Sequence, residues 1–264
     1  MIFVFVVFIL TGALAGLLSG LIGIGGGVVV VPCLYYTLTT LNIPEYEIMQ
    51  IVLGTSLATI AFNTLISASG HYRKKSVLMR PLKRMLPGLF VGSFVGATIA
   101  IYVSGSGLKY IFAGFEVLLG FYFFFAKSHP KPDNNNLPKS AGMALIGFLI
   151  STLSTLLGIS GGVITVPMLL FYKVKTRQAI GTSAAASFVV GSIGTIAYLI
   201  YGFGRSKVDM TVGYIYLPAF LAICGGSLIV APLAVELAHK LPTKVIKKFF
   251  AVILVIVGTI MFIK

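Results

Sequence analysis

The sequence carries very little charge. Only 10% of its 264 residues are charged, and only six of them are acidic. A soluble domain carries about a quarter charged residues, so the composition excludes an ordinary soluble globular protein. Two long stretches, Met1–Leu41 and Gly142–Tyr172, contain no Asp, Glu, Lys or Arg at all. About 20 apolar residues are enough for a helix to cross a bilayer, so several such runs predict an all-α, polytopic membrane protein.

Residues that bind metals or carry out covalent catalysis are also scarce. The two cysteines, Cys33 and Cys224, lie in apolar segments without partner spacing, which favours small buried residues over a disulfide or a metal pair. The three histidines, His71, His129 and His239, fall in basic loops that are far apart in the sequence. No nucleophile–base pair or pair of carboxylates can be assembled. We therefore expect no metal, no cofactor and no enzymatic activity.

The positive charge is concentrated in short loops. The net charge is +14, from 20 Lys and Arg against six acids. On a soluble protein this charge would suggest nucleic acid, but here no basic and aromatic residues interleave along a polar face. Positive charge in the short loops of a membrane protein sets its topology instead. The expected partners are the lipid bilayer and a small substrate, not nucleic acid, and the sequence leaves a homo-oligomer open.

The chain contains an internal repeat. Residues 23–32 (Gly-Ile-Gly-Gly-Gly-Val-Val-Val-Val-Pro) recur as residues 158–167 (Gly-Ile-Ser-Gly-Gly-Val-Ile-Thr-Val-Pro). Further landmarks follow in the same order: Gly54-Thr-Ser and Gly181-Thr-Ser, Leu86-Pro87 and Leu217-Pro218, then Phe112-Ala113 with Gly120 and Phe250-Ala251 with Gly258. Repeated landmarks in one order predict two homologous halves. We expect repeats over residues 1–126 and 141–264, joined by a cytoplasmic linker at residues 127–140.

Each half contains five apolar segments. The expected segments are 2–22, 27–41, 48–69, 85–103 and 108–126 in the first half, and 141–157, 162–172, 178–202, 212–235 and 245–263 in the second. If the first two segments of each half form one crossing, about 12 basic residues lie inside and about eight outside. If they instead turn back at the glycines, about 16 lie inside and about four outside. The second count favours an inverted repeat with both termini outside, and leaves open whether each pair fully spans or is re-entrant.

The glycine motifs are the first candidate site. Consecutive glycines unwind a helix cheaply and let the backbone approach a ligand. Short, glycine-interrupted segments at matching positions in two halves point to the binding site of a transporter. The alternative is that small residues only allow close helix packing. The candidate residues are Gly25, Gly26 and Gly27 in the first half, and Ser160, Gly161 and Gly162 in the second.

Uncharged polar residues follow each glycine motif. We expect the Gly-Thr-Ser motifs to open the next helix of each half and to supply hydroxyl donors to a polar substrate. The candidates are Thr55, Ser56 and Asn63 in the first half, and Thr182 and Ser183 in the second. Hydrogen bonds between neighbouring helices are the alternative role for these residues.

Glu116 is the acid placed deepest in an apolar segment, and its repeat counterpart is Leu254. A carboxyl group at such a depth is costly and often has a function in membrane proteins. One hypothesis is that Glu116 couples transport to protons. The alternatives are that it pairs with a polar neighbour or lies at a shallow position in the membrane.

The paired Gly-Ile-Gly-Gly-Gly…Pro and Gly-Ile-Ser-Gly-Gly…Pro blocks, each followed by Gly-Thr-Ser, resemble the sulfite exporter TauE/SafE family of membrane transporters. The resemblance covers nearly the whole chain. It implies secondary transport of small sulfur-containing or organic anions, such as sulfite, sulfonates or sulfoacetate, across a prokaryotic plasma membrane. With the sequence pattern, it predicts alternating access around an anion held at the glycine-rich breaks. An anion channel or an intramembrane enzyme on the same fold is the alternative.

Overall fold

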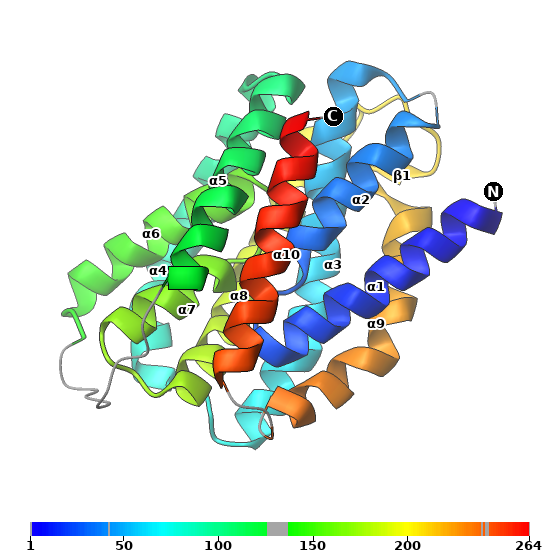
Figure 1. Cartoon of the computed structure of the whole chain (residues 1–264). Coiled ribbons are helices and arrows are strands. Elements are labelled where there is room, and N and C mark those ends of the chain that lie inside the picture. The colour runs from blue at the N-terminus through cyan, green and yellow to red at the C-terminus, as the bar shows by residue number, and fades with distance from the viewer. Residues whose placement is uncertain (1, 42, 126–136, 239, 241–242, 264) are drawn as a thin grey trace.

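The computed structural model describes residues 2–41, 43–125, 137–238, 240 and 243–263. These residues form ten helices and one two-stranded hairpin (Figure 1). The helices are α1 (Ile2–Ile22), α2 (Gly27–Thr39), α3 (Glu45–Arg73), α4 (Met79–Tyr102), α5 (Gly105–Phe125), α6 (Ser140–Leu156), α7 (Gly162–Phe171), α8 (Thr176–Gly202), α9 (Leu217–Ala238) and α10 (Thr243–Ile263). The expected all-α architecture is confirmed.

Six of the helices are long and apolar enough to cross a membrane: α1, α3, α4, α5, α8 and α9. Their outward faces carry large apolar side chains such as Leu118, Leu221 and Ile229, each more than 60% exposed. Such a surface is unfavourable in water and favourable against lipid tails. The chain is therefore a multi-pass membrane protein.

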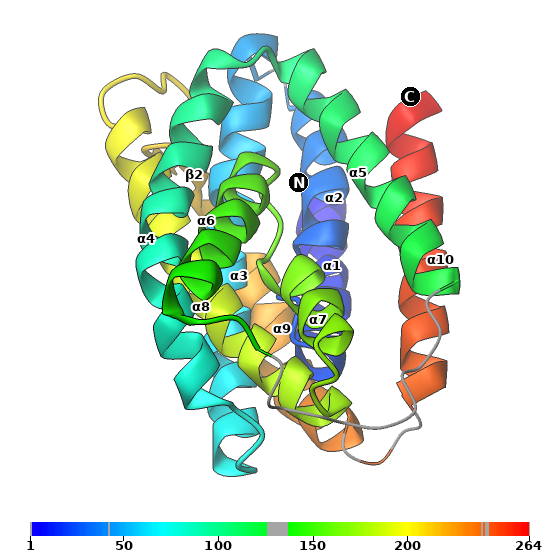
Figure 2. The same cartoon turned by 90° about the vertical axis from the view of Figure 1, so that its left-hand side faces the viewer.

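The first two helices of each half turn back on each other. In Figure 1, α1 descends from the N label to the middle of the bundle, and α2 returns to the upper end. Figure 2 shows α6 running upward and α7 descending again. At a rise of about 1.5 Å per residue, α2 with 13 residues and α7 with 10 are too short to cross a bilayer. Each pair is thus a helical hairpin that ends at a break inside the bundle.

The two halves interlock. α1 packs along α9, α6 packs along α4, α3 packs against α8, and α5 packs against α10. The closest glycine contacts repeat at both outer interfaces. A methyl group added at Gly226 would lie 2.1 Å from the carbonyl oxygen of Ile9, and one at Gly88 would lie 1.8 Å from that of Ala144. At both outer interfaces, a helix of one half therefore packs closely against a helix of the other half.

Three expectations about element positions need correction. The segment expected from residue 212 begins at Leu217, because residues 211–216 form the hairpin of β1 (Thr211–Val212) and β2 (Ile215–Tyr216), which turns at Gly213 with φ +59°. The two Leu-Pro pairs are not equivalent, since Pro87 lies inside α4 and Pro218 is the second residue of α9. The Gly-Thr-Ser motifs lie within α3 and α8 rather than at their starts, because the residues before each motif are helical too. Most of the linker expected at residues 127–140 lies outside the described residues.

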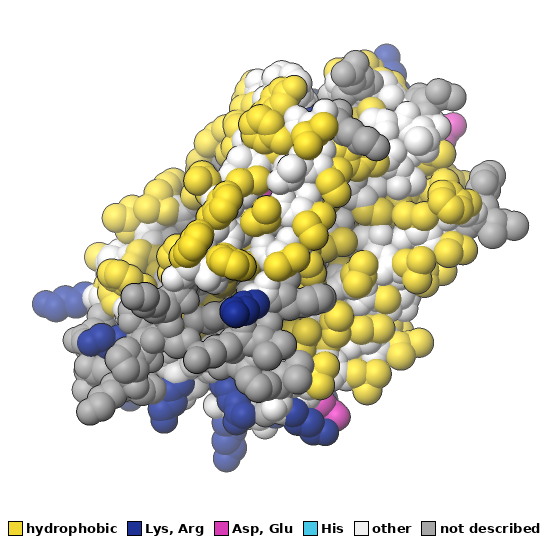
Figure 3. All heavy atoms as spheres, viewed as in Figure 1, with side chains coloured by type: hydrophobic (Ala, Val, Ile, Leu, Met, Phe, Trp, Pro, Cys, Tyr) yellow, Lys and Arg dark blue, Asp and Glu magenta, His cyan; other side chains and the backbone are white. Residues whose placement is uncertain are grey.

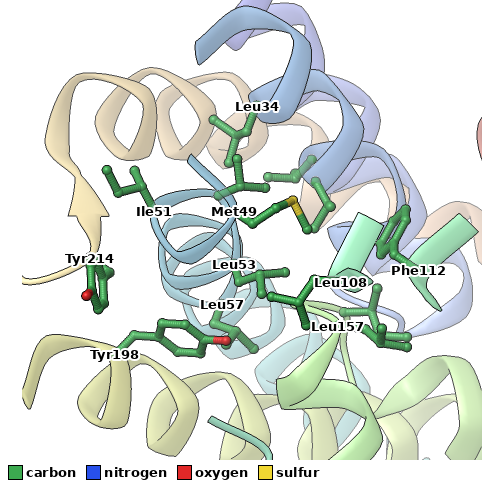
Figure 4. Close-up of a cluster of buried hydrophobic side chains, with 14 of the residues drawn as sticks. Leu34, Met49, Ile51, Leu53, Leu57, Leu108, Phe112, Leu157, Tyr198 and Tyr214 are labelled. Atoms are coloured by element: carbon green, nitrogen blue, oxygen red, sulfur yellow. The ribbon is translucent and has the colours of Figure 1, made fainter. Parts of the chain in front are cut away.

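The largest hydrophobic core surrounds α3. Figure 4 shows Leu53 and Leu57 of α3 among Leu108 and Phe112 of α5, Leu157 after α6 and Tyr198 of α8. Leu53, Leu57 and Tyr198 are fully buried. The burial of such side chains contributes about 1.5–3 kcal/mol each in water. Inside a membrane the close packing itself holds these helices together.

Basic side chains collect at one end of the bundle. In Figure 3 most of the Lys and Arg atoms lie at the lower end, beyond a broad band of hydrophobic atoms. The last residues of α3 and the first residues of α4 lie at this end. The basic residues there include Arg73, Lys74, Arg80 and Arg84. This end also carries the close of α7 and the start of α8, with Lys173. In the described residues, Lys and Arg are thus concentrated at one end of the bundle.

Candidate functional site

The two helix breaks meet inside the bundle. A methyl group added at Gly162 would lie 2.3 Å from the carbonyl oxygen of Gly23, and one at Gly27 would lie 2.8 Å from that of Gly158. The missing side chains therefore allow the two backbones to touch. The structure brings the two glycine motifs together, as a shared site requires, and it equally shows that these glycines permit close packing.

The two breaks differ in backbone conformation. Gly23, Gly25 and Gly26 all have positive φ, between +67° and +82°. In the second break Gly158 has a φ of +63°, whereas Gly161 has a right-handed helical φ of −56°. Residues other than glycine rarely adopt positive φ. The first break therefore depends more strongly on glycine than the second.

Side chains of the neighbouring helices satisfy the carbonyl groups of both breaks. Ser56 Oγ of α3 donates to the Gly158 oxygen (2.7 Å), and Ser187 Oγ of α8 donates to the Gly23 oxygen (3.3 Å). Ser160 Oγ donates to the Ile24 oxygen, so the second break also binds the first directly. Asn63 Nδ2 donates to the Gly25 oxygen (3.5 Å), and Asn63 Oδ1 accepts from Ser227 Oγ of α9. The carbonyl groups of the breaks are thus bound within the protein.

Several N–H groups of the breaks are not bound in this way. The backbone N–H groups of Gly27 and Val28, which open α2, donate to no described residue. The same is true of Gly161 and Gly162 at the start of α7. All four residues are buried. A buried N–H group without an acceptor is costly, and the N-terminus of a helix attracts negative charge.

Two serines next to the breaks were missed by the sequence analysis. Ser19 in the last turn of α1 and Ser154 in the last turn of α6 are fully buried, and neither hydroxyl has a hydrogen-bond partner among the described residues. Each stands four residues before the first glycine of its break, so they occupy equivalent positions in the repeat. An alignment of the two glycine motifs that is extended four residues towards the N-terminus shows this equivalence. The buried hydroxyl of Thr155, beside Ser154, also has no hydrogen-bond partner in the described ranges.

The Gly-Thr-Ser threonines bind elsewhere. Thr55 Oγ1 accepts a hydrogen bond from the backbone N–H of Tyr216 (2.9 Å), just before α9. Thr182 Oγ1 accepts one from the N–H of Leu78 (2.9 Å), just before α4. The two bonds are equivalent in the repeat and lie at opposite ends of the bundle. Neither threonine forms a hydrogen bond to a break, so the structure groups Ser56 with the breaks and Thr55 with a loop.

Ser183 touches the first break without bonding to it. Its hydroxyl donates to the Ile180 oxygen of its own helix (2.8 Å). A methyl group added at Gly23 would lie 2.8 Å from Ser183 Oγ. Helix α8 is therefore in contact with the first break through Ser183 and Ser187.

Charged side chains stand away from the breaks. Of the residues that the structure describes, Lys109 of α5 is the one buried cation, and its Nζ lies 5.5 Å from the ring centre of Tyr35 and 5.6 Å from that of Tyr110. Glu116 of α5 is fully buried, and neither of its carboxyl oxygens has a hydrogen-bond partner within the described part. Within the described part, Glu116 therefore lacks the polar partner that one of the alternatives to a coupling role required.

His71 was expected in a basic loop, but it lies in the last turn of α3 and is buried. Its Nε2 lies 3.2 Å from the carbonyl oxygen of Gly20 near the end of α1. This contact joins the last turn of α3 to the end of α1. His129 and His239 lie outside the described residues. Across the described ranges, no three His, Cys, Asp or Glu residues lie close enough to hold a metal ion.

The chain is similar to membrane transporters from bacteria and archaea. It is 33% identical over 257 residues to a "Probable membrane transporter protein" of Haemophilus influenzae, which covers 97% of each chain. It is 27% identical to the "Probable membrane transporter protein YunE" of Bacillus subtilis, over 96% of each chain. It is 26% identical to the "Probable membrane transporter protein MJ0441" of Methanocaldococcus jannaschii, over 96% of this chain and 93% of that one. No solved structure matches it significantly.

The family model described as "Sulfite exporter TauE/SafE" matches residues 8–261, which include both breaks and all the helices packed around them. The resemblance of the glycine motifs is thereby confirmed over nearly the whole chain. The chain belongs to the sulfite exporter TauE/SafE family of membrane transporters.

Proposed function

We propose that the protein is a secondary transporter that holds a small anion between the two helix breaks. The observation that carries this proposal is the meeting of two helix N-termini, α2 and α7, whose buried N–H groups at Gly27, Val28, Gly161 and Gly162 have no acceptor among the described residues. Each N-terminus carries roughly half a positive charge. An anion would supply the missing acceptors without a buried Lys or Arg.

The hydroxyl groups of Ser19 and Ser154 support the same site. Both hydroxyl groups are buried and have no hydrogen-bond partner in the part of the chain that the structure describes. An anion with several oxygen atoms can accept hydrogen bonds from backbone and hydroxyl groups together. This donor set suits a sulfur oxyanion, a sulfonate or a small carboxylate. Uncharged donors bind such anions weakly enough to release them, which a transporter requires.

In this proposal, the described conformation is a closed state of the transporter. The breaks are in backbone contact, and the bonds of Thr55 to Tyr216 and of Thr182 to Leu78 are both formed. In alternating access, opening towards one side would break one of these bonds and leave the other intact. Thr55 and Thr182 would then act as latches at the two ends of the pathway rather than as ligands of the anion.

The distribution of basic residues supports an inverted repeat in a prokaryotic plasma membrane. The end that carries Arg73, Arg80 and Lys173 would face the cytoplasm, because Lys and Arg in short loops stay inside. Both termini would then lie outside and the linker at residues 127–140 inside. A single cysteine introduced at position 137 of a Cys33→Ser, Cys224→Ser protein should react with an impermeant reagent only after the membrane is opened. Labelling of this cysteine in intact cells would contradict the inverted arrangement.

Counterflow in proteoliposomes tests the proposed function. The purified protein is reconstituted with unlabelled sulfite, thiosulfate, sulfoacetate or acetate inside, and uptake of the same labelled anion is followed. We expect saturable exchange of at least one of these anions, with protein-free vesicles as the control. Flux that does not saturate and shows no exchange would favour a channel, and chemical conversion of the anion would favour an enzyme. The absence of any flux would contradict the proposal.

A further inference from the structure

The carboxyl group of Glu116 is isolated inside the protein. It is 0% exposed, and both oxygens lack a hydrogen-bond partner among the described residues. Burying an unpaired carboxylate is strongly unfavourable, even after the protein relaxes around it. In the packing seen here the side chain is therefore stabilised in its neutral, protonated form.

Glu116 is not required by the helix packing around it. It lies on α5 where this helix crosses α10, and the crossing is made by equivalent glycines. A methyl group at Gly120 would lie 2.6 Å from a Val255 side-chain carbon, and one at Gly258 would lie 2.8 Å from a Val117 side-chain carbon. Leu254 is the residue at the equivalent position of the second half, and it is also fully buried. One half thus fills this position with an apolar side chain, so the acid needs another explanation.

The helices α5 and α10, which cross at Glu116, contact the helix that opens the site: α10 packs against α2, and Lys109 of α5 lies beside Tyr35 of α2. Phe112, one turn before Glu116, shares a core cluster with Leu34 of α2. Phe123, two turns after Glu116, shares another cluster with Val28 of α2 and Ile24 of the first break. The Tyr36 hydroxyl of α2 also donates to the Ile260 oxygen of α10 (3.1 Å). A movement of α2 that opens the site would therefore change the packing around Glu116.

No other described acid shares this region. Helix α1 contains no ionisable side chain, and α10 contains none from residue 251 to residue 263. Lys109 stands two turns away on α5 with the rings of Tyr35 and Tyr110, and α2 also carries Cys33 and Tyr36. The ionisable residues of α3 lie near its two ends: Glu45, Tyr46, Glu47, His71, Tyr72 and Arg73. The side chains of Lys244 and Lys247 on α10 lie outside the described set.

We propose that Glu116 binds a proton that crosses the membrane together with the anion. This inference rests on the proposed function above. While the site is open to one side, water reaches the carboxyl group and favours its charged form. When an anion binds at the N-termini of α2 and α7, two negative charges in one low-dielectric region repel, and the carboxyl takes up a proton from the water on that side. After the site opens to the other side, the anion leaves and the proton is released to water there. Each cycle then moves one proton together with one anion.

The test measures protons and anions in the same vesicles. Wild-type protein is reconstituted with a pH dye in the lumen, and each of sulfite, thiosulfate, sulfoacetate and acetate is added outside. We expect acidification of the lumen that depends on the protein and on the anion. Glu116→Gln, which keeps a neutral side chain of the same shape, should retain at least half of the anion counterflow while proton entry falls at least tenfold. Glu116→Leu, which copies position 254, is the second variant should the amide disturb folding.

Glu47→Gln is the matched control, because Glu47 is another buried acid and accepts a hydrogen bond from Ser206 Oγ (3.0 Å) near the opposite end of α3 from His71. This variant should keep the proton entry of the wild type. The proposal is overturned if Glu116→Gln moves protons at the wild-type rate, or if the wild type exchanges anions without moving protons. If the wild-type protein shows no counterflow at all, the proposed function is wrong, and this inference is wrong with it.

Discussion

The two helix breaks have nearly the same sequence but hold their backbones differently. The first break has three glycines with positive φ, and the second has one, at Gly158. Where the first break has Gly25, the second has Ser160, whose hydroxyl donates to the Ile24 oxygen across the interface. The first break is therefore shaped by glycine conformation, whereas the second is partly held by a side chain. Equivalent positions in a repeat need not tolerate the same substitutions.

Substitution at Gly26 should have the largest effect. Its φ of +82° disfavours any side chain, and an added methyl group would lie 2.4 Å from the Cβ of Ala15. Gly26→Ala should lower the free energy of unfolding by about 2–5 kcal/mol, from left-handed strain together with overpacking. Detergent-solubilised protein should lose its monodisperse peak and its thermal transition. Gly114→Ala is the control, because nothing lies within 4 Å of the added methyl group there.

The matching change in the second break should separate folding from transport. Gly161 has a helical φ of −56°, and the nearest atom to an added methyl group is a Val190 methyl carbon at 3.1 Å. Gly161→Ala should change stability by less than about 1 kcal/mol. The methyl group at the α7 N-terminus should nevertheless reduce anion affinity about tenfold, measured as the half-saturation concentration in counterflow. Unchanged affinity would mean that the anion does not approach this end of α7.

Replacing the serines beside the breaks should have opposite effects on the stability of the empty protein and on anion binding. Ser19→Ala and Ser154→Ala each remove a buried hydroxyl that has no partner among the described residues. The empty protein should be unchanged or more stable by up to about 1 kcal/mol, because an unsatisfied polar group is removed. Anion binding should weaken by about 0.5–1.5 kcal/mol for each serine. Thermal shift with and without sulfite measures both quantities, and a loss of stability without sulfite would show that these hydroxyls are structural.

The two threonine latches should give the smallest effects. Thr55→Val and Thr182→Val each remove one hydrogen bond to a loop N–H, which is worth about 0.5–1.5 kcal/mol. We expect Thr55→Val to favour opening at the end that carries the termini, and Thr182→Val to favour the basic end. Single-cysteine accessibility near each end should report this difference. Equal accessibility changes in the two variants would contradict a latch at each end.

Much of the architecture was readable in the sequence because a membrane makes long apolar segments obligatory helices. The positions of α1, α2, α7 and α10 were predicted to within a few residues. α3 and α4 extend beyond their apolar segments, since polar ends such as Arg73 and Arg80 stay helical at the surface. The hairpin at residues 211–216 was missed because its apolar residues continue directly into α9.

The candidate site was only partly readable. The glycine motifs and Ser56 were predicted as neighbours, and the structure brings them together. Ser19 and Ser154 were missed because a serine within an apolar helix resembles ordinary packing. Thr55 and Ser56 are adjacent in the sequence, but a helix directs adjacent side chains about 100° apart, so one binds a loop and the other binds a break.

The sequence by itself determined that the chain is a helical membrane protein, that it contains a repeat, and where its helices are interrupted. These properties follow from local composition, because each span must satisfy its own backbone in lipid. Only the tertiary structure decided that the breaks face each other, which hydroxyl groups bind carbonyl groups, and that Glu116 has no partner among the described residues. Those properties depend on which faces of distant helices meet, and in lipid that is decided by close packing of small residues across the whole bundle.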